Sequence, residues 1–173
     1  DYTLYLDPAF EFRGTADAKD DNDITVINTR GVSLWGTVGK YFSFQSSFYE
    51  SQSDFPKYLD TIFRKTHVVS GGARRKTLYG KFDYAIASGT ISYSLKKYFN
   101  FQFGHDKVFI GDGYRSMLLS DNAFNYPFLK ITSNFWKIKY VNLYTMFQDL
   151  NIRSNVDDGI FTKKYGSFHF LDV

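Results

Sequence analysis

The side chains best suited to chemistry are concentrated in GHDKVFIGDGYRSMLLSDNAFNYPFLKI, residues 104–131. Its glycines, Gly111 and Gly113, permit tight turns, and a dense set of polar residues surrounds them. A guanidinium group binds a carboxylate as a fork, a phenol ring offers a stacking surface, and an amide hydrogen-bonds to hydroxyl groups. The candidate ligand-binding residues of this stretch are Asp112, Tyr114, Arg115, Asp121 and Asn122.

Two roles are open for Arg115. As a structural residue it would pair with a nearby carboxylate, and its loss would leave that carboxylate unpaired. As a binding residue it would contact an acidic sugar, with Tyr114 as the stacking ring and Asn122 as the hydrogen-bonding group. The carboxylates available for the structural role are those of Asp106, Asp112 and Asp121.

A second group of cations lies in GGARRK, residues 71–76. The glycine pair is reminiscent of a phosphate-binding loop, but the GxxxxGK[ST] order is absent and no strand and helix flank the segment. Arg74 and Arg75 therefore belong either to a solvated run of charge or to a basic loop that meets anionic sugar chains.

Other kinds of chemistry have little support in the sequence. The chain has no cysteine, which excludes a disulfide framework, a thiolate metal site and a cysteine nucleophile. Its three histidines lie far apart, and the acidic run at residues 17–23 lacks the spacing of a calcium-binding EF-hand. A net charge of +3 is too small to indicate a nucleic-acid partner. We therefore expect a non-enzymatic protein without a metal, a cofactor or bound nucleic acid.

The segments that must position these loops have the pattern of β-strands. KYFNFQFG, residues 97–104, has a ring at every second position, and KYFSFQS at residues 40–46 nearly repeats it. Strict alternation is typical of a strand with two unlike faces. It predicts three hairpins with turns of about two residues, at 31–51, 84–103 and 128–148, and further strands at 2–6 and 165–171. In the third hairpin the less polar side would carry Val141, Leu143, Thr145 and Phe147.

The connections between these strands are of two kinds. The hairpin turns are short, whereas residues 52–83, 105–127 and 149–164 form long connections. Short turns at one end and long loops at the other are typical of an antiparallel transmembrane β-barrel, whose strands need about ten residues each. In that fold the rings of Phe99, Phe101 and Phe103 would face lipid. Aromatic girdles would be formed by Tyr41, Tyr84, Tyr98, Trp136 and Tyr140.

The alternative fold is a soluble β-sandwich, in which the same rings would point into a core. Sandwich cores are rich in Val, Ile and Leu, but 20% of this chain is aromatic. The composition therefore favours the barrel.

In the central loop the chain resembles the Wzi-type capsule assembly family of outer-membrane proteins. The similarity rests on GDGYRS, LLSDNA and YPFLKI, flanked by FQFGHDK and WKIKYVNLY, and spans about residues 84–144. The resemblance implies a large barrel in the Gram-negative outer membrane that is occluded by helical segments. It also implies a lectin-like protein that attaches or organises capsular polysaccharide, with some relatives associated with gliding motility. The loop signature that carries over comprises residues 111–116 and 119–123, and it implies no catalytic role.

We therefore expect residues 1–173 to be part of a single outer-membrane β-barrel domain without an internal domain boundary. About eight strands of a larger barrel would lie in this chain, joined by long and partly helical loops. The expected partners are outer-membrane lipid, surface or capsular polysaccharide, and other outer-membrane proteins. Export would depend on a signal peptide outside this chain. The alternative function is a pore or partner subunit of an outer-membrane transport, secretion or gliding machine.

Overall fold

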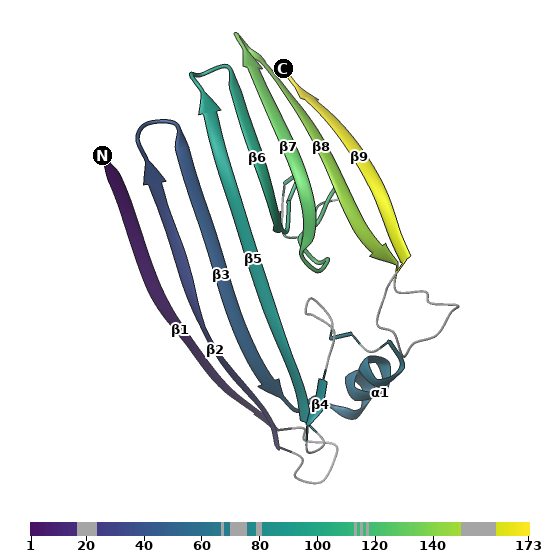
Figure 1. Cartoon of the computed structure of the whole chain (residues 1–173). Coiled ribbons are helices and arrows are strands. Elements are labelled where there is room, and N and C mark those ends of the chain that lie inside the picture. Colours follow the sequence, from purple (N-terminus) through teal and green to yellow (C-terminus); the bar gives the residue numbers. More distant parts are fainter. Residues whose placement is uncertain are drawn as a thin grey trace.

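The strands follow one another across one antiparallel sheet in their order along the chain, and only the short β4 lies off this path (Figure 1). The computed structural model describes residues 1–16, 24–66, 68–69, 76–78, 81–112, 114, 116, 118–149 and 162–173. The elements are β1 (Tyr2–Ala16), β2 (Ile24–Val38), β3 (Phe42–Ser53), α1 (Lys57–Thr66), β4 (Lys76–Leu78), β5 (Lys81–Leu95), β6 (Phe99–Asp106), β7 (Tyr126–Phe135), β8 (Ile138–Asp149) and β9 (Thr162–Asp172). The predicted all-β class, the eight consecutive strands and the helix within a long connection are confirmed.

Each of the three predicted hairpin turns is present, and each contains a residue with positive φ. These residues are Gly39, Lys96 and Trp136, with φ values of 61°, 52° and 54°. Positive φ allows the chain to reverse within a few residues, although it is uncommon for a residue other than glycine. The ladders show that the turns at 39–41 and 96–98 have three residues, whereas the turn at 136–137 has two.

The two faces of the sheet differ in chemistry because paired residues of neighbouring strands project from the same face. We call one side the ring face; it carries Phe44, Phe48, Ile91, Phe101 and Phe103, among others. We call the opposite side the polar face; it carries Ser33, Gln45, Ser47, Ser88 and Gln102, among others. The alternation predicted for these strands is therefore present in the register.

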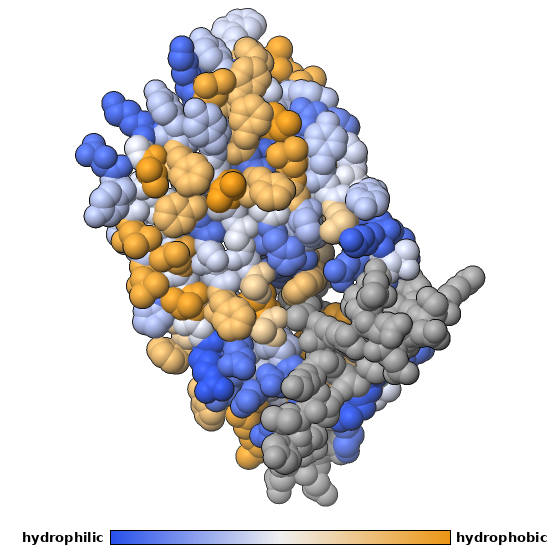
Figure 2. Space-filling view, viewed as in Figure 1, coloured by the Kyte–Doolittle hydropathy of each residue, from blue (hydrophilic) through white to orange (hydrophobic). Residues whose placement is uncertain are grey.

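Many apolar side chains of the ring face are exposed. Leu4, Phe48 and Phe103 are 58%, 51% and 61% exposed. Figure 2 shows hydrophobic residues spread over the face of the sheet that is turned toward the viewer. Single exposed apolar residues are ordinary, but an apolar area extending over several strands marks a surface that contacts something other than water.

The helix α1 covers the polar face at the loop end of β5. Its Phe63 is buried with Phe82 of β5 and Val69, and Phe55 packs edge-on against Phe63 with 4.9 Å between the ring centroids. The polar surface of α1 is stabilised by a 2.6 Å ion pair between Arg64 and Asp60, one helical turn apart. The hydrogen bond and charge of Asp60 raise the pKa of the Arg64 guanidinium.

The connection between β6 and β7 covers another part of the polar face. Its Val108 is buried against Tyr126, Phe128 and Leu143. The Tyr126 hydroxyl accepts a hydrogen bond of 3.1 Å from the Val108 amide. Two long connections therefore fill the loop end of the polar face with aromatic and aliphatic groups.

This packing adds to one detail of the sequence interpretation and corrects another. The less polar side of β8 lies on the polar face, where Val141 and Leu143 are buried and where the connection between β6 and β7 covers Leu143. Tyr84, predicted in a lipid-facing girdle, also lies on the polar face, and its ring stacks near Phe55. The alternation pattern gives the side of a strand but not what covers that side, so the place of Tyr84 near a strand end suggested a lipid-facing girdle.

The sheet is open. β1 and β9 are its two edges, and no pairing joins them in the strands that the structure describes. Among the described residues, no helix has the length and apolar character that crossing a membrane requires.

Candidate functional site

A row of small side chains crosses the polar face between two carboxylates. Asp7 of β1 pairs with Ser33 of β2, Ser33 with Ser47 of β3, and Ser47 with Ser88 of β5. Asp106, the last residue of β6, continues this row. The row spans about 19 Å, because neighbouring strands lie about 4.8 Å apart. Three serines between larger residues leave a low floor.

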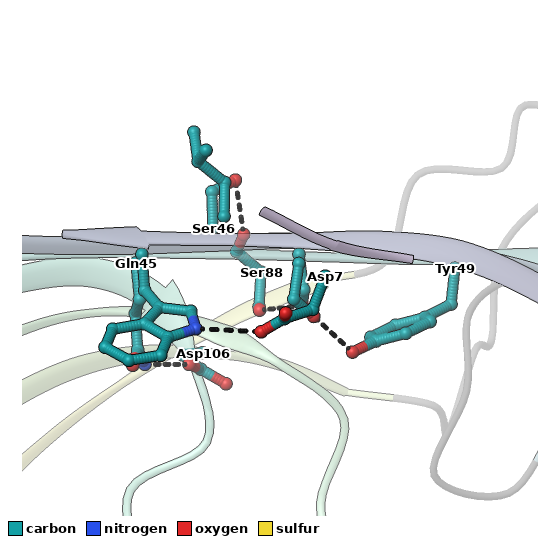
Figure 3. A pocket seen from close by; sticks show the side chains of 10 residues that line it. Asp7, Gln45, Ser46, Tyr49, Ser88 and Asp106 are labelled. Carbon is teal, nitrogen blue, oxygen red and sulfur yellow. Dashed lines mark hydrogen bonds between the residues drawn. The ribbon is translucent and has the colours of Figure 1, made fainter. Parts of the chain in front are cut away.

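A hollow of about 460 Å³ lies over this floor (Figure 3). Figure 3 shows Asp7, Tyr49, Ser88 and Asp106 on one side of the sheet and Ser46 on the other. A smaller hollow of about 280 Å³ lies next to it, toward the hairpin turns. Both hollows are lined by Trp35 and Gln45, so they form one continuous surface.

An aromatic pair forms one wall of the larger hollow. Tyr5 and Trp35 are direct partners in the β1–β2 ladder, and their rings stack with centroids 4.1 Å apart and planes 16° apart. The indole Nε1 of Trp35 donates a 3.2 Å hydrogen bond to Oδ2 of Asp7, which fixes the rotation of the ring. Trp35 remains 45% exposed. In the ladders Tyr5 is its neighbour on the β1 side and Gln45 its neighbour on the β3 side.

The opposite wall is polar. Nε2 of Gln45 donates a 3.2 Å hydrogen bond to Oδ2 of Asp106. The other oxygen of Asp106, Oδ1, accepts a 2.7 Å hydrogen bond from the Lys107 amide. These two bonds orient the carboxylate over the end of the serine row.

The hydroxyl groups of the floor are paired with one another. Ser47 and Ser88 lie 2.6 Å apart, and Ser33 lies 2.7 Å from the Tyr49 hydroxyl. A hydroxyl donates one hydrogen bond and accepts two, so each pair retains one hydrogen and several lone pairs for a ligand. The hollow thus combines a stacking ring with donors and acceptors, which suits a hydroxyl-rich ligand.

The loop residues predicted from the sequence lie elsewhere. Asp112, Tyr114, Asp121 and Asn122 are all exposed on the connection between β6 and β7, and Tyr114 is 89% exposed. In the part of this loop that the structure describes, no hydrogen bond joins the side chains of Asp112, Asp121 and Asn122. The structure therefore places these four residues on one loop, and their role as a binding site stays a prediction.

The loop is held by residues outside that prediction. Ile110 and Leu119 form an antiparallel bridge, with hydrogen bonds of 2.9 and 3.3 Å between their main chains. The Ser116 hydroxyl donates to the Ile110 carbonyl and accepts a hydrogen bond of 3.0 Å from the Leu118 amide. Gly111 has a φ of 130°, a conformation that favours glycine. Ser116 and the Ile110–Leu119 bridge thus hold the described part of this loop in place.

The predicted cations cannot be placed. Arg74, Arg75 and Arg115 lie outside the described residues, as does the acidic run at 17–23, so both roles of Arg115 stay predictions. Within the described part of the chain, no group of three histidine, aspartate or glutamate side chains has an arrangement that would hold a metal.

The sequence interpretation missed Asp7, Trp35 and Gln45 as members of one site. Only the register places them together, since they lie on three strands. One signal was present in the sequence: in VSLWGTV, residues 32–38, the alternation puts Trp35 on the same side of the strand as Ser33 and Thr37. A tryptophan on the polar side of an alternating strand marks a position where a ring meets a polar surface.

No family model, no curated protein and no solved structure matches this chain. The resemblance to the capsule assembly family therefore stays a prediction from the residues of the central loop.

Proposed function

We propose that this chain is part of an outer-membrane β-barrel protein that binds surface polysaccharide without chemically altering it. The observation that carries the proposal is the Tyr5–Trp35 pair beside a serine floor, on the opposite side of the sheet from the exposed ring face. A barrel uses these two chemistries together, because its outer side meets lipid and its inner side is polar.

The exposed ring face supports membrane insertion. Its apolar side chains lie on several neighbouring strands, an arrangement that a lipid surface would cover. The open edges at β1 and β9 support a larger barrel, since in lipid each unpaired main-chain group costs several kcal/mol.

Binding is favoured over a pore by the packing on the polar face. Phe82 of the sheet is buried under Phe63 of α1, and Leu143 of the sheet is buried under Val108 of the β6–β7 connection. A face that is filled at one end and hollowed in its middle is better suited to holding a ligand than to conducting one. This agrees with the occluded barrel that the resemblance implies.

The proposal has a direct test in the organism that makes the protein. Cells without the protein should retain less surface polysaccharide, and the purified protein should require detergent to remain monodisperse. The isolated polysaccharide should bind to the protein and keep its chain length during incubation. A protein that is monodisperse without detergent would contradict the membrane assignment, and shortened chains would contradict the non-catalytic one.

A further inference from the structure

The charges around the two hollows identify a ligand class more narrowly than the fold does. Among the described residues that line it, the larger hollow has two carboxylates, Asp7 and Asp106, and no lysine, arginine or histidine. The part of the chain that the structure describes contributes no charged side chain to the lining of the smaller hollow. Lys130 pairs with Gln102 at the rim of the smaller hollow, on the far side from Asp7. An anionic sugar over the serine floor would meet two like charges without a cation between them.

The aromatic wall adds a second requirement. The face of an aromatic ring is electron-rich, so it attracts the C–H groups on the apolar face of a pyranose ring. Trp35 is fixed by its bond to Asp7 and backed by Tyr5, so the stacking surface is already in place before a ligand arrives. A preorganised aromatic surface loses little conformational entropy on binding.

The polar groups complete the match. Asp7 and Asp106 carry acceptor oxygens, and the serine pairs keep one hydroxyl hydrogen each. Sugar hydroxyls both donate and accept hydrogen bonds, so they can satisfy the carboxylate acceptors and the hydroxyl donors of the hollow. The carboxylate group of an acidic sugar would add only acceptors. We infer that the larger hollow binds a neutral glycan segment, with one sugar ring stacked on Trp35 and the next residues lying over the serine floor toward Asp106. This inference rests on the proposed polysaccharide-binding function and names the sugar class of its site.

The chain provides a matched pair of variants, because it contains two tryptophans. Trp35 lies in the hollow, whereas Trp136 is 94% exposed in a hairpin turn. The purified protein and the variants Trp35→Ala, Trp35→Phe and Trp136→Ala would be assayed by affinity electrophoresis. The gels would contain neutral polymers (dextran, laminarin, mannan) or acidic ones (alginate, hyaluronate, polygalacturonate).

We expect retardation by at least one neutral polymer, a loss of tenfold or more in affinity for Trp35→Ala, and partial retention for Trp35→Phe. Trp136→Ala should behave as the unmodified protein. Thermal unfolding would show whether Trp35→Ala is folded; if it is not, Ser47→Leu, which fills the floor and retains the ring, replaces it and should lose binding equally.

The outcomes separate the two claims. Retardation only by acidic polymers, or neutral binding unaffected by both Trp35→Ala and Ser47→Leu, would overturn the neutral-glycan site while leaving polysaccharide binding in place. No retardation by either set, together with no binding of the native surface polysaccharide, would overturn the proposed function itself.

Discussion

The side-chain amide of Asn125 donates a 2.8 Å hydrogen bond to the main-chain carbonyl of Ala87. This bond lies at a part of the β5 edge that no neighbouring strand among the described residues covers. β6 pairs with β5 only as far as Gly89, and β4 meets β5 again only at residues 81–83. Between these two points the edge of β5 has no strand partner in the described chain, and a side chain from the β6–β7 connection hydrogen-bonds to it instead.

Replacing Asn125 by alanine should therefore lower the stability of the sheet. Asn125 is buried, and its loss leaves the Ala87 carbonyl with only a longer contact of 3.3 Å to the His105 ring. The net loss of one such hydrogen bond costs about 0.5–1.5 kcal/mol. Thermal or denaturant unfolding of the purified protein would measure this loss. Asn122→Ala, at an exposed position of the same loop, is the control and should change stability little. Equal stability of the two variants would show that Asn125 does not fasten the loop to β5.

A second prediction concerns the attachment of α1. Phe63 is 3% exposed and packs edge-on against Phe55 and Phe82, so Phe63→Ala removes the main contact between the helix and the sheet. Truncating a buried Phe costs about 3–5 kcal/mol. We expect faster amide hydrogen exchange across α1, with the strand amides less affected. Ile62→Ala, at a position that is 51% exposed on the same helix, should leave exchange unchanged. Uniformly faster exchange in all strands would mean that the helix is needed for the whole sheet.

The strands could be predicted because their information is local. In KYFNFQFG the period of two sets which residues share a face, and the turn beside Lys96 sets where the chain reverses. The pairing of strands in three hairpins follows from those two features, but their exact register does not, because two of the turns have three residues and one has two. Packing on each face could not be predicted, because it depends on where α1 and the central loop come to rest.

The candidate site could be predicted even less well, because its residues come from several strands. Sequence reasoning selects Asp112, Tyr114 and Asn122 because they are close in the chain, and the structure leaves them exposed on a loop. The hollow is instead lined by Asp7 and Asp106, which are far apart in sequence and lie at the two ends of a row across five strands. Such a row can be recognised only when the register of every strand pair is known.

A third prediction concerns the orientation of the sheet in the membrane. The chain has no cysteine, so single cysteines can be introduced at the two ends of the strands. Short turns of outer-membrane barrels lie in the periplasm, whereas long loops lie outside the cell. On intact cells an impermeant maleimide should label Asp121→Cys in the β6–β7 loop and leave Lys137→Cys in the hairpin turn unlabelled. After permeabilisation both should react. Labelling of Lys137→Cys alone on intact cells would invert the topology.

The last prediction separates a lipid-covered ring face from a water-covered one. Phe103 lies on this face and is 61% exposed, with Ile91 and Leu129 as its neighbours in the ladder. If the face meets lipid, Phe103→Lys places a cation in the hydrocarbon layer at a cost of about 2–4 kcal/mol. If the face meets water, the same change should be neutral.

The matched control lies on the polar face. Gln102 is unsuitable because it pairs directly with Lys130, and two like charges opposite one another are themselves destabilising. Ser43, which lines the smaller hollow between Thr37 and Ser92, avoids that repulsion. We expect Phe103→Leu and Ser43→Lys to fold into lipid vesicles with nearly unchanged stability and Phe103→Lys to lose about 2–4 kcal/mol. Equal loss for both lysine variants would point to a polar face packed as tightly as the ring face, and no loss for Phe103→Lys would remove lipid as the partner of the rings.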